Sequence, residues 1–152
     1  LLEPTIIAEL YKASRAGVKI DLIVRGVCSL RAGVPGLSEN ITVRSIVGRF
    51  LEHHRIYYFY ANGDEKVMLS SADWMERNFF RRVEVAFPVR DKRLKARVIR
   101  EGLMVPLRDN TAVWLMRPDG TYVRRKPGKR PFNSQMALMQ ELAQHVQTGT
   151  RG

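Results

Sequence analysis

The sequence lacks several features that would point to common kinds of site. It has one cysteine, Cys28, and three histidines among 152 residues. A single cysteine excludes an intrachain disulfide and fits a reducing compartment. No His/Cys cluster has zinc spacing, and there is no Gly-x4-Gly-Lys-Ser/Thr loop, no Gly-x-Gly-x-x-Gly after a strand and no Gly-x-Ser-x-Gly elbow. The sequence therefore excludes a zinc site of usual spacing, the common nucleotide-binding loops and the serine-hydrolase elbow.

Long apolar runs are also missing. No run approaches the roughly 20 residues of a membrane span, and no signal-peptide pattern opens the chain. The default location is therefore the cytoplasm. Because the chain begins with Leu rather than Met, we expect it to be a piece of a longer protein. The length suits one domain, which we place at residues 1–147, with a frayed tail at 148–152.

Acidic residues are few relative to basic ones. There are 15 Asp and Glu against 26 Lys and Arg, which gives a net charge of +11. Of the basic residues 19 are Arg and 7 are Lys. This bias favours planar, bidentate capture of phosphate or carboxylate groups. The charge predicts a polyanionic partner or substrate but does not say which polyanion it is.

The hydrophobic pattern predicts a mixed β-sheet flanked by helices, which is an α/β fold. Asn62-Gly63 and Pro118-Asp119-Gly120 predict hairpin turns, and the long loop 27–40 is of a size that is usually functional or mobile. Helices are expected at residues 4–16, from a cap at Asp91 to about Glu101, and from a cap at Ser134; strands are expected at 18–24, 41–46, 56–60, 67–70, 81–87, 110–116 and 121–123.

The stretch from Ser45 to Arg55 holds two histidines, two arginines and a glutamate between apolar segments. If Arg55 opens the strand that follows, His53 and Arg55 project from the same face, because strand side chains alternate. An imidazole beside a fixed cation can hold a phosphate and hand it a proton. The alternative is a solvated, polar lead-in to a strand.

Two further places carry candidate groups. Arg25 follows an apolar strand, and in α/β sheets functional groups collect beyond the carboxyl ends of strands. It could equally be a charge that terminates the strand. Ser71 and Asp73 stand in a polar turn, where either could cap a short helix, or both could orient the histidine from behind.

Four segments together resemble a known family. Gly17–Gly26, Pro35–Ile41, the Ser45–Arg55 stretch and Ser70–Met75 are similar to the last catalytic domain of bacterial polyphosphate kinase. The resemblance runs in one order from about residue 1 to residue 143. Several long motifs in order are far more specific than one short pattern.

The resemblance implies reversible transfer of the terminal phosphate of ATP to inorganic polyphosphate, with magnesium and through a phosphohistidine. That histidine would lie in a preceding domain, so this fragment alone should be inactive. The domain would have the fold of one half of a phospholipase D. The partners implied are ATP or ADP, polyphosphate, the preceding domains and other copies in a homo-oligomer, with no nucleic acid. The full-length enzyme would be cytoplasmic and could associate with a membrane.

The family motifs map onto particular residues. The histidine of the Leu-Glu-His motif is His53, and the arginine that contacts the nucleotide phosphates is Arg25. Arg55 stands where the phospholipase D pattern has Lys, which agrees with polyphosphate kinases and would also contact phosphate. Phe79-Phe80 departs from the usual apolar–acidic pair and puts local contacts there in question. No magnesium ligand is identified in this chain.

Two other functions remain open from the residues. A phospholipase-D-type phosphodiesterase or nuclease would complete its site by dimerising. A basic nucleic-acid-binding module would interleave basic residues with exposed aromatics on one surface. Here most aromatics fall within apolar strand or helix patterns, which disfavours the second of these.

Overall fold

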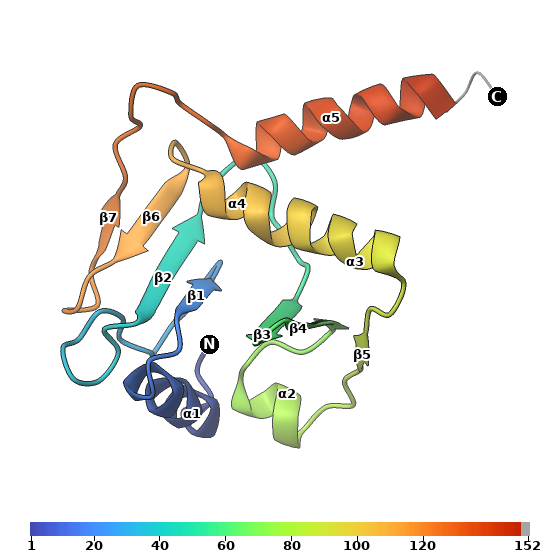
Figure 1. Cartoon of the computed structure of the whole chain (residues 1–152). Coiled ribbons are helices and arrows are strands. Elements are labelled where there is room, and N and C mark those ends of the chain that lie inside the picture. Colours follow the sequence, from blue (N-terminus) through green and yellow to red (C-terminus); the bar gives the residue numbers. More distant parts are fainter. Residues whose placement is uncertain (150–152) are drawn as a thin grey trace.

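The structure, a computed structural model, describes residues 1–149, with side chains for residues 1–144. The predicted mixed α/β class is confirmed, but the strands form two sheets instead of one (Figure 1). In chain order the elements are α1 (Pro4–Arg15), β1 (Ile20–Ile23), β2 (Ile41–Ile46), β3 (Ile56–Ala61), β4 (Asp64–Ser70), α2 (Glu76–Phe80), β5 (Ala86–Pro88), α3 (Lys92–Ile99), the π-helical η1 (Arg100–Met104), α4 (Val105–Arg108), β6 (Val113–Met116), β7 (Tyr122–Arg124) and α5 (Ser134–Gly149).

The first sheet has the strand order β1-β2-β6-β7. β1 and β2 are parallel, with Ile20 opposite Ile41, while β6 and β7 are antiparallel to their neighbours. Because β1 and β2 run in the same direction, their carboxyl ends lie at the same edge of the sheet. The chain leaves this edge twice, once toward Arg25 and once into the segment 47–55, which leads to β3.

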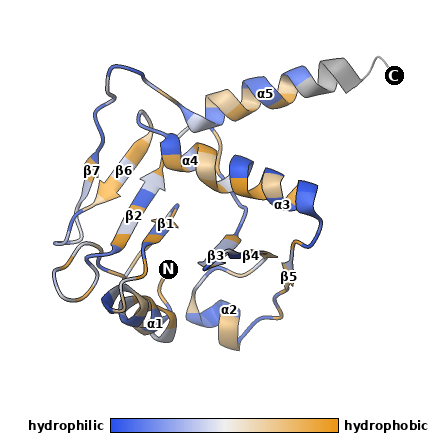
Figure 2. Cartoon of the chain, viewed as in Figure 1, coloured by the Kyte–Doolittle hydropathy of each residue, from blue (hydrophilic) through white to orange (hydrophobic). Residues whose placement is uncertain are grey.

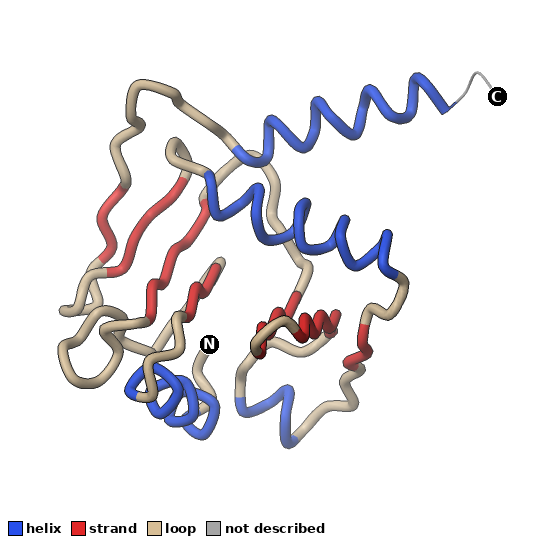
Figure 3. Tube along the Cα trace, in the orientation of Figure 1, coloured by secondary structure: helices blue, strands red, loops and turns tan. Residues whose placement is uncertain are grey.

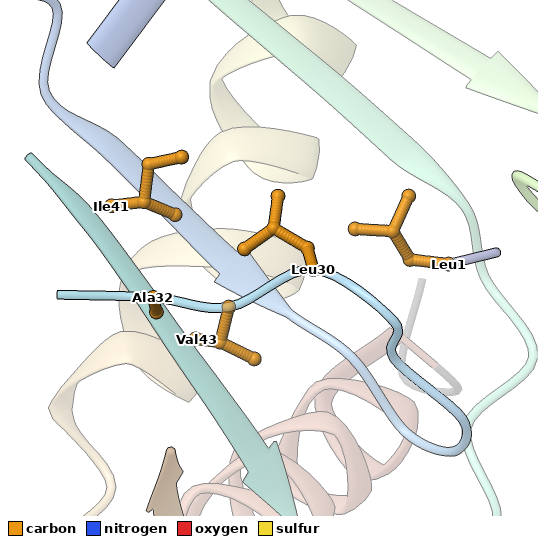
Figure 4. Packing of buried hydrophobic residues seen from close by; sticks show 5 residues of the cluster. All are labelled: Leu1, Leu30, Ala32, Ile41 and Val43. Atoms are coloured by element: carbon orange, nitrogen blue, oxygen red, sulfur yellow. The ribbon is translucent and has the colours of Figure 1, made fainter. Parts of the chain in front are cut away.

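The main core lies against this four-stranded sheet. Figure 4 shows its buried cluster of Leu1, Leu30, Ala32, Ile41 and Val43. Leu30 and Ala32 come from the long loop between β1 and β2 and are only 1% and 2% exposed. This loop therefore serves the core, and residues of α1 such as Ile7 and Leu10 pack beside it. Its Gly33 and Gly36 have positive φ, which lets the loop fold back on itself.

The second sheet has the order β3-β4-β5 and is antiparallel throughout. The predicted turn at Asn62-Gly63 is confirmed, and both residues have positive φ (48° and 100°), as a two-residue hairpin requires. Figure 2 shows that its strands mix hydrophobic and hydrophilic residues, as β2 does, whereas β6 is mainly hydrophobic. Val67 is the one buried hydrophobic residue among the described side chains of these three strands.

The strand predicted for residues 81–87 is wrong over most of its length, because only Ala86–Pro88 pairs with β4. Side chains hold the preceding segment instead. The Glu84 carboxylate accepts hydrogen bonds from Ser71 and Asn78, and the Val85 N–H donates to Ser71 Oγ at 3.0 Å. An alternating pattern of residues cannot reveal that side chains, rather than a neighbouring strand, satisfy the backbone.

The helix predicted to end near Glu101 continues through η1 and α4 to Arg108, as Figure 3 shows. Gly102 lies within this continuation, where its φ is not positive and it serves packing. A Cβ on Gly102 would lie 2.1 Å from Cδ1 of Ile56 on β3. The glycine therefore lets the helix lie close to the second sheet. In the part of the chain that the structure describes, no helix is long and apolar enough to cross a membrane.

The residues that cap the helices agree only in part with those predicted from the sequence. Asp91 caps α3 as predicted, because its Oδ1 accepts the Leu94 N–H at 2.8 Å. The predicted cap of α2 by Ser71 or Asp73 is wrong, since α2 begins after Met75 with no side-chain cap. Asn133 rather than Ser134 caps α5, with Oδ1 accepting the Met136 N–H at 3.0 Å. Part of the predicted tail at 148–152 lies in α5, which ends at Gly149, and residues 150–152 lie outside the described residues.

Candidate active site

The candidate site lies on the segment 47–55, which connects the first sheet to the second. Arg25 follows β1, and its Nη1 donates a hydrogen bond of 2.5 Å to the carbonyl of Glu52, the residue before His53. The two segments are far apart in sequence, but the parallel pairing of β1 and β2 starts both from one sheet edge. The structure thus brings together the two residues on which the sequence-based hypothesis depends, Arg25 and the His53 segment.

The two adjacent histidines have different surroundings. Both side chains are exposed. The Nδ1 atom of His54 lies 3.4 Å from Glu52 Oε2, whereas His53 accepts a hydrogen bond from Arg55 through its backbone carbonyl. β3 begins at Ile56, so neither histidine is part of the strand. The condition for placing His53 and Arg55 on one strand face is therefore not met.

Arg55 makes structural contacts. Its Nε and Nη2 donate to the two carboxylate oxygens of Asp73 at 3.0 and 3.1 Å, and its Nη1 donates to the carbonyl of His53 at 2.7 Å. The hydrogen bonds from Arg55 lower the pKa of Asp73 below its ordinary value. Arg55 thereby ties the His53 backbone to the polar turn after β4. Its predicted contact with phosphate stays a prediction.

Ser71 and Asp73 were predicted to orient the histidine. Among the described residues, Asp73 is linked to His53 through Arg55, and the link is to the His53 backbone. Ser71 contacts Glu84 and Val85. Beside them, Tyr57 stacks on Trp74 with ring centroids 5.1 Å apart and donates to the Ala72 carbonyl at 2.8 Å. These contacts make the turn a firm base for Asp73.

Sequence reasoning missed Gln135, at the start of α5. Its side chain donates to the Phe50 carbonyl at 2.8 Å and to Glu52 Oε1 at 3.0 Å, and it accepts from the Phe50 N–H at 2.9 Å. Gln135 lies more than 80 residues from these partners, and no local pattern distinguishes it from the other glutamines of α5.

The site is rich in cations and poor in free carboxylates. Asp73 is paired with Arg55, and Glu52 contacts Gln135 and His54. Among the described residues, no three His, Cys, Asp or Glu side chains gather into a possible metal site. Hard cations such as magnesium take oxygen ligands, so the groups present do not fit a magnesium site built by this chain. They fit an anion instead.

The fold and site together define a mixed α/β domain with a candidate phosphate-handling centre on the segment that connects its two sheets. Comparison with known proteins identifies it further. Over residues 1–135 the chain matches the family described as polyphosphate kinase C-terminal domain 2, and it belongs to that family. The resemblance found in the sequence is confirmed.

Relatives and a solved structure agree with this assignment. The polyphosphate kinases of Paraburkholderia phytofirmans and Burkholderia lata are 73% and 72% identical to it over 139 residues, covering 91% of this chain and 20% of each relative. The crystal structure of polyphosphate kinase from Porphyromonas gingivalis superposes with a TM-score of 0.90 at 40% identity, covering 97% of this chain and 23% of that one. The chain thus spans about a fifth of the length of the curated relatives it matches.

Proposed function

We propose that this chain is the C-terminal catalytic domain of an enzyme that transfers the terminal phosphate of ATP reversibly to inorganic polyphosphate. Family membership and the 40% identical solved polyphosphate kinase support this function. The net charge of +11 suits ATP, ADP and polyphosphate as substrates. The enzyme would work in the cytoplasm, as a homo-oligomer whose other domains complete the site.

The observation that carries the proposal is the contact between Arg25 and the Glu52 carbonyl. A guanidinium has five N–H donors, and this contact uses one of them. The remaining donors can bind phosphate oxygens bidentately, which is the strongest form of this contact. Because the accepting carbonyl belongs to the residue before His53, a phosphate on Arg25 would lie next to the histidine segment.

Phosphoryl transfer needs positioning and charge stabilisation more than new bonds to the protein. In the first step, the bond from the γ-phosphorus to the ADP oxygen breaks as a histidine nitrogen of the preceding domain bonds to phosphorus. Arg25 would neutralise the phosphate oxygens. His53 would act as general acid on the leaving ADP oxygen. A terminal polyphosphate oxygen then takes the phosphoryl group from that histidine.

Arg55 and Asp73 would support this step by holding the His53 backbone in place. Their two-point pairing fixes the guanidinium that holds the His53 carbonyl. The family implies magnesium, but no carboxylate set at this site is free to hold it. We therefore assign the metal no ligand among the described residues of this chain, and derive no step from it.

The proposal is tested in the full-length parent enzyme with Arg25→Ala, Arg25→Lys and the control Arg93→Ala. Arg93 is exposed on α3, so its loss removes the same charge away from the site. Arg25→Ala should lower kcat/KM for ATP about ten- to a hundredfold, because a charge-assisted phosphate contact is lost. Arg25→Lys should recover little, because lysine cannot bind bidentately.

Equal, small losses for Arg25→Ala and Arg93→Ala would contradict the role of Arg25. The isolated chain should also take no stable label from γ-labelled ATP, because the phosphorylated histidine is elsewhere. Hydrolysis of DNA or phospholipid by the full-length enzyme would favour a phosphodiesterase instead.

A further inference from the structure

The segment that carries His53 is held by one residue from the far end of the fold. Gln135 is only 5% exposed and makes three hydrogen bonds to this segment. Two of them engage both backbone groups of Phe50, and the third engages the Glu52 side chain. A buried amide with this many partners fixes its segment firmly, because leaving those groups unpaired is costly.

The segment also has a glycine where Gln135 approaches it. A Cβ on Gly48 would lie 2.3 Å from Gln135 Oε1 and 2.8 Å from its Cδ. A side chain at position 48 would therefore force the buried, hydrogen-bonded amide of Gln135 to move. Gly48 and Gln135, which are far apart in sequence, are thus in close contact in the fold.

Gln135 itself stands on a rigid base. Asp109 is fully buried, and its Oδ2 accepts hydrogen bonds from the N–H and hydroxyl of Ser134 at 2.7 and 2.9 Å. Its Oδ1 accepts from the N–H groups of Thr111 and Ala112 at 2.9 and 2.8 Å. The start of α5 is therefore bound to the segment before β6, which holds the backbone next to Gln135 in place.

We infer that Gln135 is a positioning residue for the proposed catalysis, acting through Glu52 on His53 and Arg25. Glu52 connects them, since its side chain accepts from Gln135, its carbonyl accepts from Arg25, and His53 follows it in the chain. A displacement of about 1 Å at a reacting group can lower a rate about a hundredfold. This inference rests on the proposed roles of His53 and Arg25.

The first test compares Gln135→Met with Gln140→Met in the full-length parent enzyme. Both make the same change on α5, but Gln140 is exposed and lies away from the site. Gln135→Met should lower kcat about ten- to a hundredfold, with a smaller change in KM for ATP. Gln140→Met should leave both constants as in the parent. Equal effects of the two variants would overturn the inference.

The decisive test repeats Gln135→Met in a His53→Ala background. If Gln135 acts largely by placing His53, its substitution should cause a much smaller loss there than in the parent enzyme, because only the placement of Arg25 remains to be disturbed. A full additional loss would mean that Gln135 acts by another route and would overturn the inference. If His53→Ala alone were silent, the proposed function would fail instead, so the two failures are distinguishable.

A second variant covers the case in which Gln135→Met does not fold. Gln135→Glu keeps the shape and the acceptor for Phe50, but it places a carboxylate against Glu52. It should lower kcat strongly, and adding Glu52→Gln should restore part of the loss by re-forming the hydrogen bond in the opposite direction. No recovery in the double variant would overturn the inference.

Discussion

The two sheets of this domain differ in what holds them. The four-stranded sheet packs against α1 and the long loop, and Leu30, Val43 and Val113 are each 1% exposed. The three-stranded sheet and the segments beside it leave large apolar side chains in solvent, among them Phe59, Phe80 and Phe87. Hydrophobic burial therefore stabilises the first region, while the hairpin, the turn after β4 and the packing of Ile56 under Gly102 organise the second.

The candidate site lies on the segment that joins these regions. Arg25 extends from the well-packed sheet, and Arg55 and Asp73 belong to the sparsely packed one. His53 lies between them, held from both sides through its own carbonyl and that of Glu52. The first region thus serves as the base of the site, and the second completes it.

Core truncation should show this difference most strongly. Leu30→Ala should lower the free energy of unfolding by about 3 kcal/mol, because it leaves a cavity in the main cluster. Leu69→Ala on β4, where the side chain is only partly buried, should lower it by about 1 kcal/mol. Urea denaturation of the chain measures both. Equal losses would remove the distinction between the two sheets.

Asp109→Asn should give the next largest effect, about 2 kcal/mol, because buried N–H and hydroxyl groups lose a charged acceptor. Burial alone would raise the pKa of Asp109, but the hydrogen bonds from Ala112, Ser134 and Thr111 prevail and lower it. A lowered pKa contributes stability that is present above the ordinary value near 3.8 and is lost as pH falls through the folded value.

The difference in stability between the parent chain and Asp109→Asn should therefore be constant at neutral pH and shrink below about pH 4. Urea denaturation over a range of pH measures it. A difference that grew as pH fell would show that the folded pKa is raised and would contradict the hydrogen-bond account.

The Arg55–Asp73 pair should give the smallest effect on stability. Because both side chains are partly exposed, a double-mutant cycle with alanine should give a coupling of about 0.5–1 kcal/mol. The exposed pair Glu9–Lys12 on α1 is the control and should give about 0.3 kcal/mol or less. A coupling no larger than that of the control would mean that the pair does not organise the second region.

The elements that the sequence predicted well are those specified by local chemistry. β2 has the predicted bounds, and the Asn62-Gly63 hairpin and the Asp91 cap form as their residue types require. Arg25 lies beyond a strand end, as the α/β pattern predicted. In each case the residues that decide the outcome are neighbours in the chain.

The features that the sequence could not predict depend on partners far along the chain. The helix was expected to end near Glu101, but Gly102 packs against Ile56, which is 46 residues away, and the Ser134 cap was misassigned because Asp109 takes that hydroxyl. The role of Gln135 depends on Phe50 and Glu52. The division into two sheets likewise follows from tertiary packing rather than from any strand's own pattern.

The most direct test of the central claim compares His53→Ala with His54→Ala in the full-length parent enzyme. The account predicts that His53→Ala lowers kcat about 10²–10⁴-fold, as loss of a general acid does, with an unchanged melting temperature. His54→Ala should keep nearly full activity, since its exposed ring pairs with the Glu52 side chain and has no part in the proposed chemistry. Damage from His54→Ala with a silent His53→Ala, or silence of both, would contradict the assignment of His53.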